Sequence, residues 1–286
     1  MIRESVAAGG FYPATATEIK ELIGKYMAKT SDGPIKIKKE KSIACGLSPH
    51  AGYLYSGKTA ARFYSSLAEG MPSRYIVIGP NHTGWGDPIS IMDEGEWETP
   101  LGKVPIDSEL ASSLLEHSDL ISNDHKAHKM EHSVEVQLPF LQYLRDDITF
   151  VPMCLRLQDL ESVIEVSQAI RESVDDNVCV IASSDLVHFG SRYGYRPFIG
   201  NERETIEWIE RNDRQVLAMV EARDVDGMYD FISNLNYTMC GYGAAGIAML
   251  VATQFGLAGK ILDYTTSYEA SGDFNLVVGY GSVIFR

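Results

Sequence analysis

Two histidines and one cysteine lie where a folded chain could bring imidazole and thiolate groups together. His50 follows the apolar run Ile43–Leu47, and His82 follows the apolar run Tyr75–Gly79. Cys240 comes directly before a long and mostly apolar segment, and the start of a helix favours a thiolate. Imidazole nitrogen and thiolate sulfur are preferred donors for iron, copper and zinc ions. These three residues are therefore candidate metal ligands, although each could instead be an ordinary loop or core residue.

Two more polar residues follow a third apolar run, Val178–Ala182. Asp185 and His188 are three positions apart just beyond it. A carboxylate can fix the tautomer of an imidazole and raise its basicity. We therefore predict that Asp185 orients His188 and that the pair is a catalytic acid–base group. Two alternatives stay open: His188 could be a further metal ligand, or the pair could only stabilise the turn.

The remaining histidines of interest lie between residues 124 and 135. His125 and His128 alternate with lysines in a polar stretch, so we expect both to be exposed. His132 differs, because it begins an amphipathic segment that leads toward the core. We therefore include His132 among the candidate catalytic residues. The sequence contains no HExxH, Walker or GxGxxG motif, so zincin, nucleotide-triphosphatase and dinucleotide-binding functions lack support.

Apolar runs alternate with amphipathic segments along the whole chain, which is typical of an α/β protein. Besides the three runs above, we expect strands over residues 148–153, 261–268 and 276–285 and a hairpin pairing 89–91 with 96–99. Expected helices cover residues 17–28, 58–67, 107–117, 131–144, 157–173, 202–222 and 241–255. We expect a turn at 31–34 and a solvated basic run at 36–41. The prediction is one α/β sandwich domain over residues 1–286, with a largely parallel or mixed central sheet.

Composition narrows the classes of partner. The net charge of the 286 residues is -14, which argues against nucleic acid or an anionic membrane. No apolar stretch approaches the ~18 to 20 residues of a membrane span, and no signal peptide is evident at the start. The four cysteines are scattered without a CxxC pair, and Cys45, Cys154 and Cys179 lie in apolar runs. Buried free thiols suit a reducing compartment, so we expect a cytoplasmic protein.

Taken together, these motifs resemble the Memo family, and the similarity extends over nearly the whole chain. The signatures appear in order as AGGFYP from Ala8, PHAGY from Pro49, GPNH from Gly79, WETPLG from Trp97, EHSVE from Glu131, SSDLVH from Ser183 and CG from Cys240. The resemblance implies a fold similar to class III extradiol dioxygenases, which use mononuclear non-haem iron. It also implies metal ligands at His50, His82 and Cys240, with His188 close by.

This chain differs from the proteins that it resembles at two positions. The dioxygenases use a glutamate as third ligand where this chain has Cys240, and many Memo relatives carry a histidine where this chain has Gln137. A soft thiolate favours iron(II) or copper over zinc as the cofactor, and it weakens the expectation of ring-cleaving dioxygenase activity. Prokaryotic Memo-like proteins are also similar to a component of a set that includes a radical SAM protein. That similarity implies a functional link to such a protein.

Three functions are consistent with these residues. The first is a metal-dependent redox enzyme acting on a small molecule, with Asp185 and His188 as acid and base. The second is a binding module that holds a peptide or protein in the same pocket, with aromatic walls such as Tyr53 and Tyr55. The third is a zinc-dependent hydrolase with Glu131 or His188 as base. The substrate, the metal and the oligomeric state remain open at this point.

Overall fold

The computed structural model describes residues 1–28, 37–39 and 42–286. The turn predicted at 31–34 and residues 36, 40 and 41 of the predicted basic run lie outside the described residues. Within them, no helix is long and apolar enough to cross a membrane.

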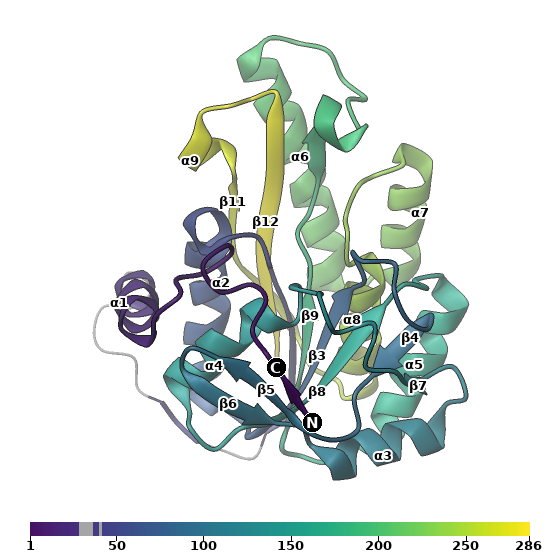
Figure 1. Cartoon of the computed structure of the whole chain (residues 1–286). Helices are drawn as coiled ribbons and strands as arrows, with labels where there is room; N and C mark the ends of the chain where they lie inside the picture. The colour runs from purple at the N-terminus through teal and green to yellow at the C-terminus, as the bar shows by residue number, and fades with distance from the viewer. Residues whose placement is uncertain (29–36, 40–41) are drawn as a thin grey trace.

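A mixed sheet crosses the molecule (Figure 1). Its order in the described residues is β10 (His188–Gly190), β12 (Leu276–Phe285), β2 (Ala44–Ser48), β9 (Val178–Ser183), β3 (Arg74–Pro80), β8 (Thr149–Leu155), β4 (Ile89–Ile91) and β7 (Ser122–Asn123), with β11 (Gly259–Thr266) paired to β12. The four strands β2, β9, β3 and β8 are parallel, whereas β12 and β4 flank them in antiparallel pairs. The predicted mixed α/β architecture is confirmed.

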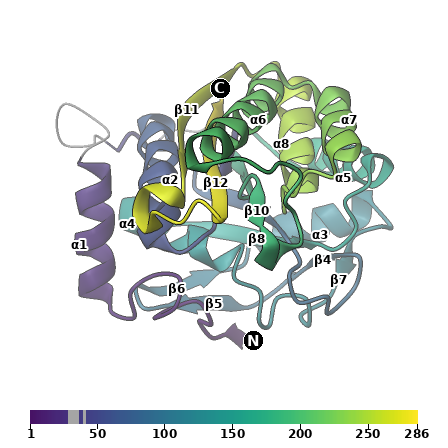
Figure 2. The same cartoon turned by 90° about the horizontal axis from the view of Figure 1, so that it is seen from above.

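Helices cover both faces of this sheet, which explains why its central strands are apolar throughout. Figure 2 shows one group of helices on each side. One side carries α1 (Ala16–Met27), α2 (Tyr53–Leu67) and α4 (Leu138–Leu144) over an aromatic-rich core. The other carries α3 (Ser108–His117), α5 (Leu160–Ser173), α6 (Glu202–Ala222), α7 (Val225–Leu235) and α8 (Tyr242–Gln254) over a mostly aliphatic core. The short helix α9 (Tyr268–Ser271) joins β11 to β12.

The predicted hairpin between residues 89–91 and 96–99 is wrong. Strand β4 belongs to the central sheet, where it runs antiparallel to β8 and its two isoleucines are buried. Strand β5 (Glu96–Thr99) instead pairs with β6 (Gly102–Pro105) and with β1 (Ile2–Arg3) in a separate three-stranded sheet. The turn from β5 to β6 ends at Gly102, whose φ of 121° is open to glycine but strained for other residues.

The predicted helix over 131–144 is shorter than expected. Residues 131 and 132 have no regular structure, residues 133 and 134 form a turn, Glu135–Gln137 form a 3-10 turn, and α4 begins only at Leu138. Pro139 lies in the first turn of α4, where its missing N–H costs nothing. Within a longer helix its ring would collide with the carbonyl four residues earlier. The broken helix leaves His132 in a loop beside the edge of the sheet.

Candidate metal centre

The predicted metal ligands lie at the carboxyl-terminal edge of the parallel strands, as expected for an α/β ligand site. His50 lies two residues beyond β2, and His82 lies two residues beyond β3. Cys240 lies two residues before α8. All three line one cavity of about 830 Å³, together with His132, Asp185 and His188. The fold therefore gathers every predicted site residue around one pocket.

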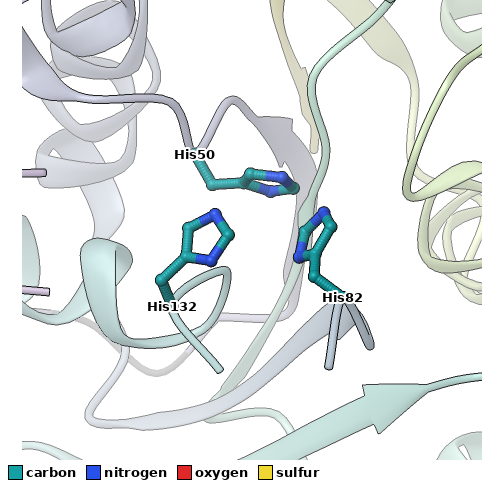
Figure 3. A group of neighbouring side chains, drawn as sticks. All are labelled: His50, His82 and His132. Atoms are coloured by element: carbon teal, nitrogen blue, oxygen red, sulfur yellow. The ribbon is translucent and has the colours of Figure 1, made fainter. Parts of the chain in front are cut away.

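Three imidazoles meet at the base of this pocket. His50, His82 and His132 each offer a ligand atom, and these atoms all lie within 4.8 Å of one another. The ring centroids of His82 and His132 are 4.7 Å apart, and Phe11 stacks on the outer face of His132. Figure 3 shows the three rings grouped around a common point. His132, predicted as a catalytic residue, thus stands beside the two predicted histidine ligands as a potential third nitrogen donor.

Cys240 joins this group through its sulfur. The Sγ atom lies 3.3 Å from Nε2 of His50, although the two residues are 190 positions apart in the chain. Gly241 allows this approach, because a Cβ atom at that position would lie 2.7 Å from the carbonyl oxygen of Ser183. The pocket therefore presents nitrogen and sulfur donors side by side.

The tautomer of His50 follows from its hydrogen-bond partners. Ser183 Oγ donates to the Ser133 carbonyl at 2.6 Å and accepts from the side-chain amide of Gln137 at 2.8 Å. Since the hydroxyl proton is already used, Ser183 can only accept from Nδ1 of His50, 3.1 Å away. Nδ1 of His50 therefore carries a proton, and Nε2, which faces Cys240, is the ring atom that can bind a metal once it is unprotonated. Neither Ser183 nor Gln137 was predicted to have this function.

Glu131 fixes the other two histidines. Its side chain is fully buried and accepts a hydrogen bond from Nδ1 of His82 at 2.9 Å. It also accepts from the main-chain N–H groups of His82, His132 and Ser133 at 2.6 to 2.9 Å. A carboxylate behind an imidazole orients the ring and increases its basicity as a ligand. From the sequence, Glu131 was considered only as the base of a zinc-dependent hydrolase. Its spacing did not predict that its carboxylate holds His82 and His132.

The charges in the pocket follow from these contacts. Burial opposes ionisation of Cys240, but the adjacent His50 and His82 lower the pKa of its thiol to about 6. Burial likewise opposes a charge on His82, yet hydrogen bonds with Cys240 and Glu131 raise the pKa of that ring to about 10. For His132, burial and the nearby His50 lower the pKa to about 3. Near neutral pH the metal-free pocket therefore holds a thiolate–imidazolium pair beside a neutral His132.

The structure contradicts the prediction that Asp185 orients His188. Asp185 Oδ1 instead accepts from the main-chain N–H groups of His50 and Ala51, at 2.8 and 3.3 Å. Nδ1 of His188 faces two carbonyl oxygens, those of Thr238 at 3.0 Å and Leu186 at 3.2 Å. The side chains diverge because Asp185 turns back to the loop after β2, whereas His188 begins strand β10. Nδ1 must carry the proton to satisfy these carbonyls, so Nε2 of the neutral ring is the basic atom.

The predicted exposure of His128 is also wrong. Its side chain is fully buried, and its Nδ1 lies 3.3 Å from the sulfur of Cys154. Burial lowers the pKa of this imidazole to about 3, so the ring stays neutral. The flanking lysines misled the prediction, because the chain turns tightly from 125 to 131 and only one side of the turn faces solvent. His125, in contrast, is partly exposed.

The donor atoms fit a single transition-metal ion. Neutral imidazole nitrogens and a thiolate are the forms that bind metal; the surrounding contacts favour the thiolate, whereas His82 must lose a proton when it binds. A soft sulfur beside two or three nitrogens is typical of iron, copper or zinc and not of calcium or magnesium. The site also opens into the pocket, which leaves room for a further ligand.

Comparison with known proteins identifies the family. The family model for Memo-like protein matches residues 3–284. The chain belongs to the Memo-like family. MEMO1 family proteins of Pyrococcus furiosus and Thermococcus onnurineus are 39% and 40% identical to it, each match covering the whole chain and at least 99% of the relative. A MEMO1 family protein of Methanobrevibacter smithii is likewise 40% identical over the full length of both chains. The family resemblance inferred from the ordered motifs is confirmed.

Proposed function

We propose that this Memo-family protein binds one iron(II) or copper ion through His50, His82 and Cys240 and uses it in a redox reaction on a small molecule. The observation that carries the proposal is the meeting of three imidazole nitrogens and a thiolate-prone sulfur at the base of an open pocket. His132 is the alternative nitrogen donor to Cys240, or a fourth donor beside it. The printed names of the relatives give the family and no reaction.

Sulfur ligation supports iron or copper more than zinc as the working ion. When bound, such an ion supplies one-electron chemistry, which imidazole and carboxylate side chains lack. The chain itself would supply orientation and proton transfer. Nε2 of His188 is a basic atom on the pocket wall, and it could accept a proton from a bound substrate. The predicted link to a radical SAM protein remains a proposal drawn from the family resemblance.

The shape of the pocket favours peptide binding as the second candidate function. The cavity of about 830 Å³ lies in the upper part of the range for small-molecule pockets, so it also has room for a short peptide segment, and Phe11, Tyr55 and Tyr193 line it. The hydrolase alternative gains less support. Glu131 is fully buried and already accepts hydrogen bonds from three main-chain N–H groups and from His82, so it is poorly placed to deprotonate a water molecule.

Metal titration of variants tests the assignment. Anaerobic protein is titrated with iron(II), and separately with copper, in the parent and in Cys240→Ser, His82→Ala and His132→Ala. We expect Cys240→Ser and His82→Ala to lose tight binding, whereas the exposed His117→Ala keeps it as the matched control. Parent affinity in both Cys240→Ser and His82→Ala would refute the ligand set. Oxygen uptake by the iron-loaded parent then separates a redox role from a binding role.

A further inference from the structure

Asp213 is a buried carboxylate that none of the proposed chemistry uses. It lies in the middle of α6 and is fully enclosed. It accepts hydrogen bonds from the phenol groups of Tyr237 and Tyr264 and from the main-chain N–H of Val187. No arginine, lysine or histidine hydrogen-bonds to it among the described residues. A buried charge without a cation is costly, so a residue of this kind calls for an explanation.

The two oxygen atoms of Asp213 contact different parts of the fold. Oδ1 is shared by Tyr237 and the N–H of Val187, which lies 3.1 Å away. Among the described residues, Oδ2 accepts only from Tyr264 on β11, at 2.7 Å. Val187 and Tyr237 are 50 positions apart in the chain, so one oxygen atom joins two separate segments.

Those two segments carry chemical groups of the pocket. One residue beyond Val187 and Tyr237, His188 and Thr238 are bonded to each other: the Thr238 hydroxyl accepts the N–H of His188 at 2.9 Å, and its carbonyl faces His188 Nδ1 at 3.0 Å. Two residues further on, Cys240 Sγ lies 3.8 Å from the carbonyl oxygen of Asp185. The Asp213 bridge is therefore the first of several contacts that hold these segments in register.

We propose that Asp213 is a positioning residue, and that its Oδ1 sets the place of His188 and Cys240 in the pocket. The inference rests on the proposed function of these two side chains, although their placement can be measured without metal. The long helix α6 makes a firm base, because it packs against β11 and β12 and begins with a capping box at Asn201. Close packing also restricts the carboxylate itself, since a Cβ on Gly279 would lie 1.9 Å from Oδ2.

Two tyrosine variants provide a matched test of this proposal. Tyr237→Phe and Tyr264→Phe each remove one phenol hydroxyl from Asp213. Only Tyr237 is followed directly in the chain by residues that line the pocket, Thr238 to Cys240. Asp213→Asn is the conservative variant, because an amide oxygen can still accept from Val187 and Tyr237. Asp213→Ala removes the bridge altogether. Thermal unfolding of each variant records the general cost in stability.

The rate of iodoacetamide alkylation of Cys240 at pH 7 reports on its position in the metal-free protein. The other three cysteines are buried, so Cys240 is the thiol that reacts in the folded chain. We expect Tyr237→Phe and Asp213→Ala to slow alkylation by about tenfold, because a sulfur that leaves the imidazoles loses thiolate character. Asp213→Asn and Tyr264→Phe should react at nearly the parent rate. The ¹⁵N spectrum of the His188 ring should likewise lose its fixed Nδ1–H tautomer only in the first two variants.

The two proposals can fail separately. Equal alkylation rates in Tyr237→Phe and the parent, or an equal loss in Tyr264→Phe, would overturn the positioning role of Asp213. A parent protein that binds neither iron nor copper would overturn the proposed function and leave the alkylation result intact. If Asp213→Ala does not fold, the comparison of the two tyrosine variants still decides the question.

Discussion

The two walls of the pocket are built by different means. On one wall, His50 and His82 are held by buried side chains, Ser183 and Glu131, which accept their Nδ1 protons. On the other wall, His188 is held by main-chain carbonyls and by Thr238. A buried carboxylate such as Glu131 also raises the basicity of its ring, whereas neutral carbonyls of a loop mainly fix the position and tautomer of theirs. The imidazole wall should therefore control metal affinity, and the His188 wall should control what happens beside the metal.

The largest effect should come from removing the charge behind the imidazoles. Glu131→Gln replaces an acceptor of four hydrogen bonds with a side chain that has only one oxygen atom. We expect metal affinity to fall by about a hundredfold, the upper end of the effect of removing such an outer partner. Isothermal titration of the anaerobic protein with iron(II) measures this change.

Glu135→Gln is the matched control for that experiment. Glu135 is also a fully buried carboxylate, but it accepts from Tyr12 and pairs with Arg3 on the far side of the same turn. Its loss should lower stability and leave metal affinity close to that of the parent. Burial raises the pKa of Glu135, but Arg3, Tyr12 and the main-chain N–H of Val6 together outweigh burial and hold this pKa below its ordinary value. Its contribution to stability should therefore be full above the unfolded pKa near 4.5 and be lost as pH falls through the folded value. Equal loss of metal affinity in both variants would remove the distinction drawn for Glu131.

How much of this wall was predictable from sequence depends on the kind of contact. Apolar runs before His50 and His82 identified strands, and parallel strands bring their exit loops to one edge of a sheet. The supporting contacts of Glu131 and Ser183 were not predictable, because each depends on a hydrogen bond between residues 49 to 133 positions apart. The same limit explains the error at Asp185, whose true partner His50 lies 135 residues away, whereas His188 is near in the chain.

The second prediction concerns Cys240 in the metal-free protein. Because His50 and His82 lower the pKa of the thiol to about 6, alkylation by iodoacetamide should reach half of its maximal rate near pH 6. An ordinary thiol would reach this point near its usual pKa of about 8.5. In His82→Ala the midpoint should move upward, and the rate at pH 7 should fall by about tenfold. A parent midpoint above pH 8 would show that the imidazoles do not stabilise the thiolate.

Metal binding should in turn release a proton in the same pH range. Between pH 6 and 10 the metal-free pocket carries an imidazolium at His82, and that proton must leave before the nitrogen can bind a metal. Calorimetry in two buffers of different ionisation enthalpy counts the protons released. We expect about one near neutral pH. Release of no proton, with tight binding retained, would exclude His82 as a ligand in this protonation state.

A smaller effect should come from Ser183→Ala. The change leaves His50 Nδ1 and the Gln137 amide without their shared acceptor, but it removes no charge. We expect metal affinity to fall by about tenfold, the lower end for loss of an outer partner. Ser167→Ala is the control, since that buried hydroxyl on α5 donates to the Ile164 carbonyl and does not line the pocket. An equal effect in both variants would show that loss of a buried hydroxyl in general, not the tautomer of His50, is responsible.

The smallest effect on metal affinity should come from the other wall. His188→Ala removes a ring that bonds to loop carbonyls and to no proposed ligand, so metal stoichiometry should be unchanged and affinity should change by less than about tenfold. Asp185→Ala, three residues earlier, should weaken binding more, because it removes the Oδ1 atom that accepts from the main-chain N–H of His50. This order reverses the simple expectation that a histidine in a metal pocket matters more than a buried aspartate. Complete loss of metal in a folded His188→Ala would instead make His188 a ligand and join the two walls into one coordination sphere. If Asp185→Ala weakens metal binding more than His188→Ala does, at equal thermal stability, the two walls act separately: one binds the ion, and the other faces the substrate.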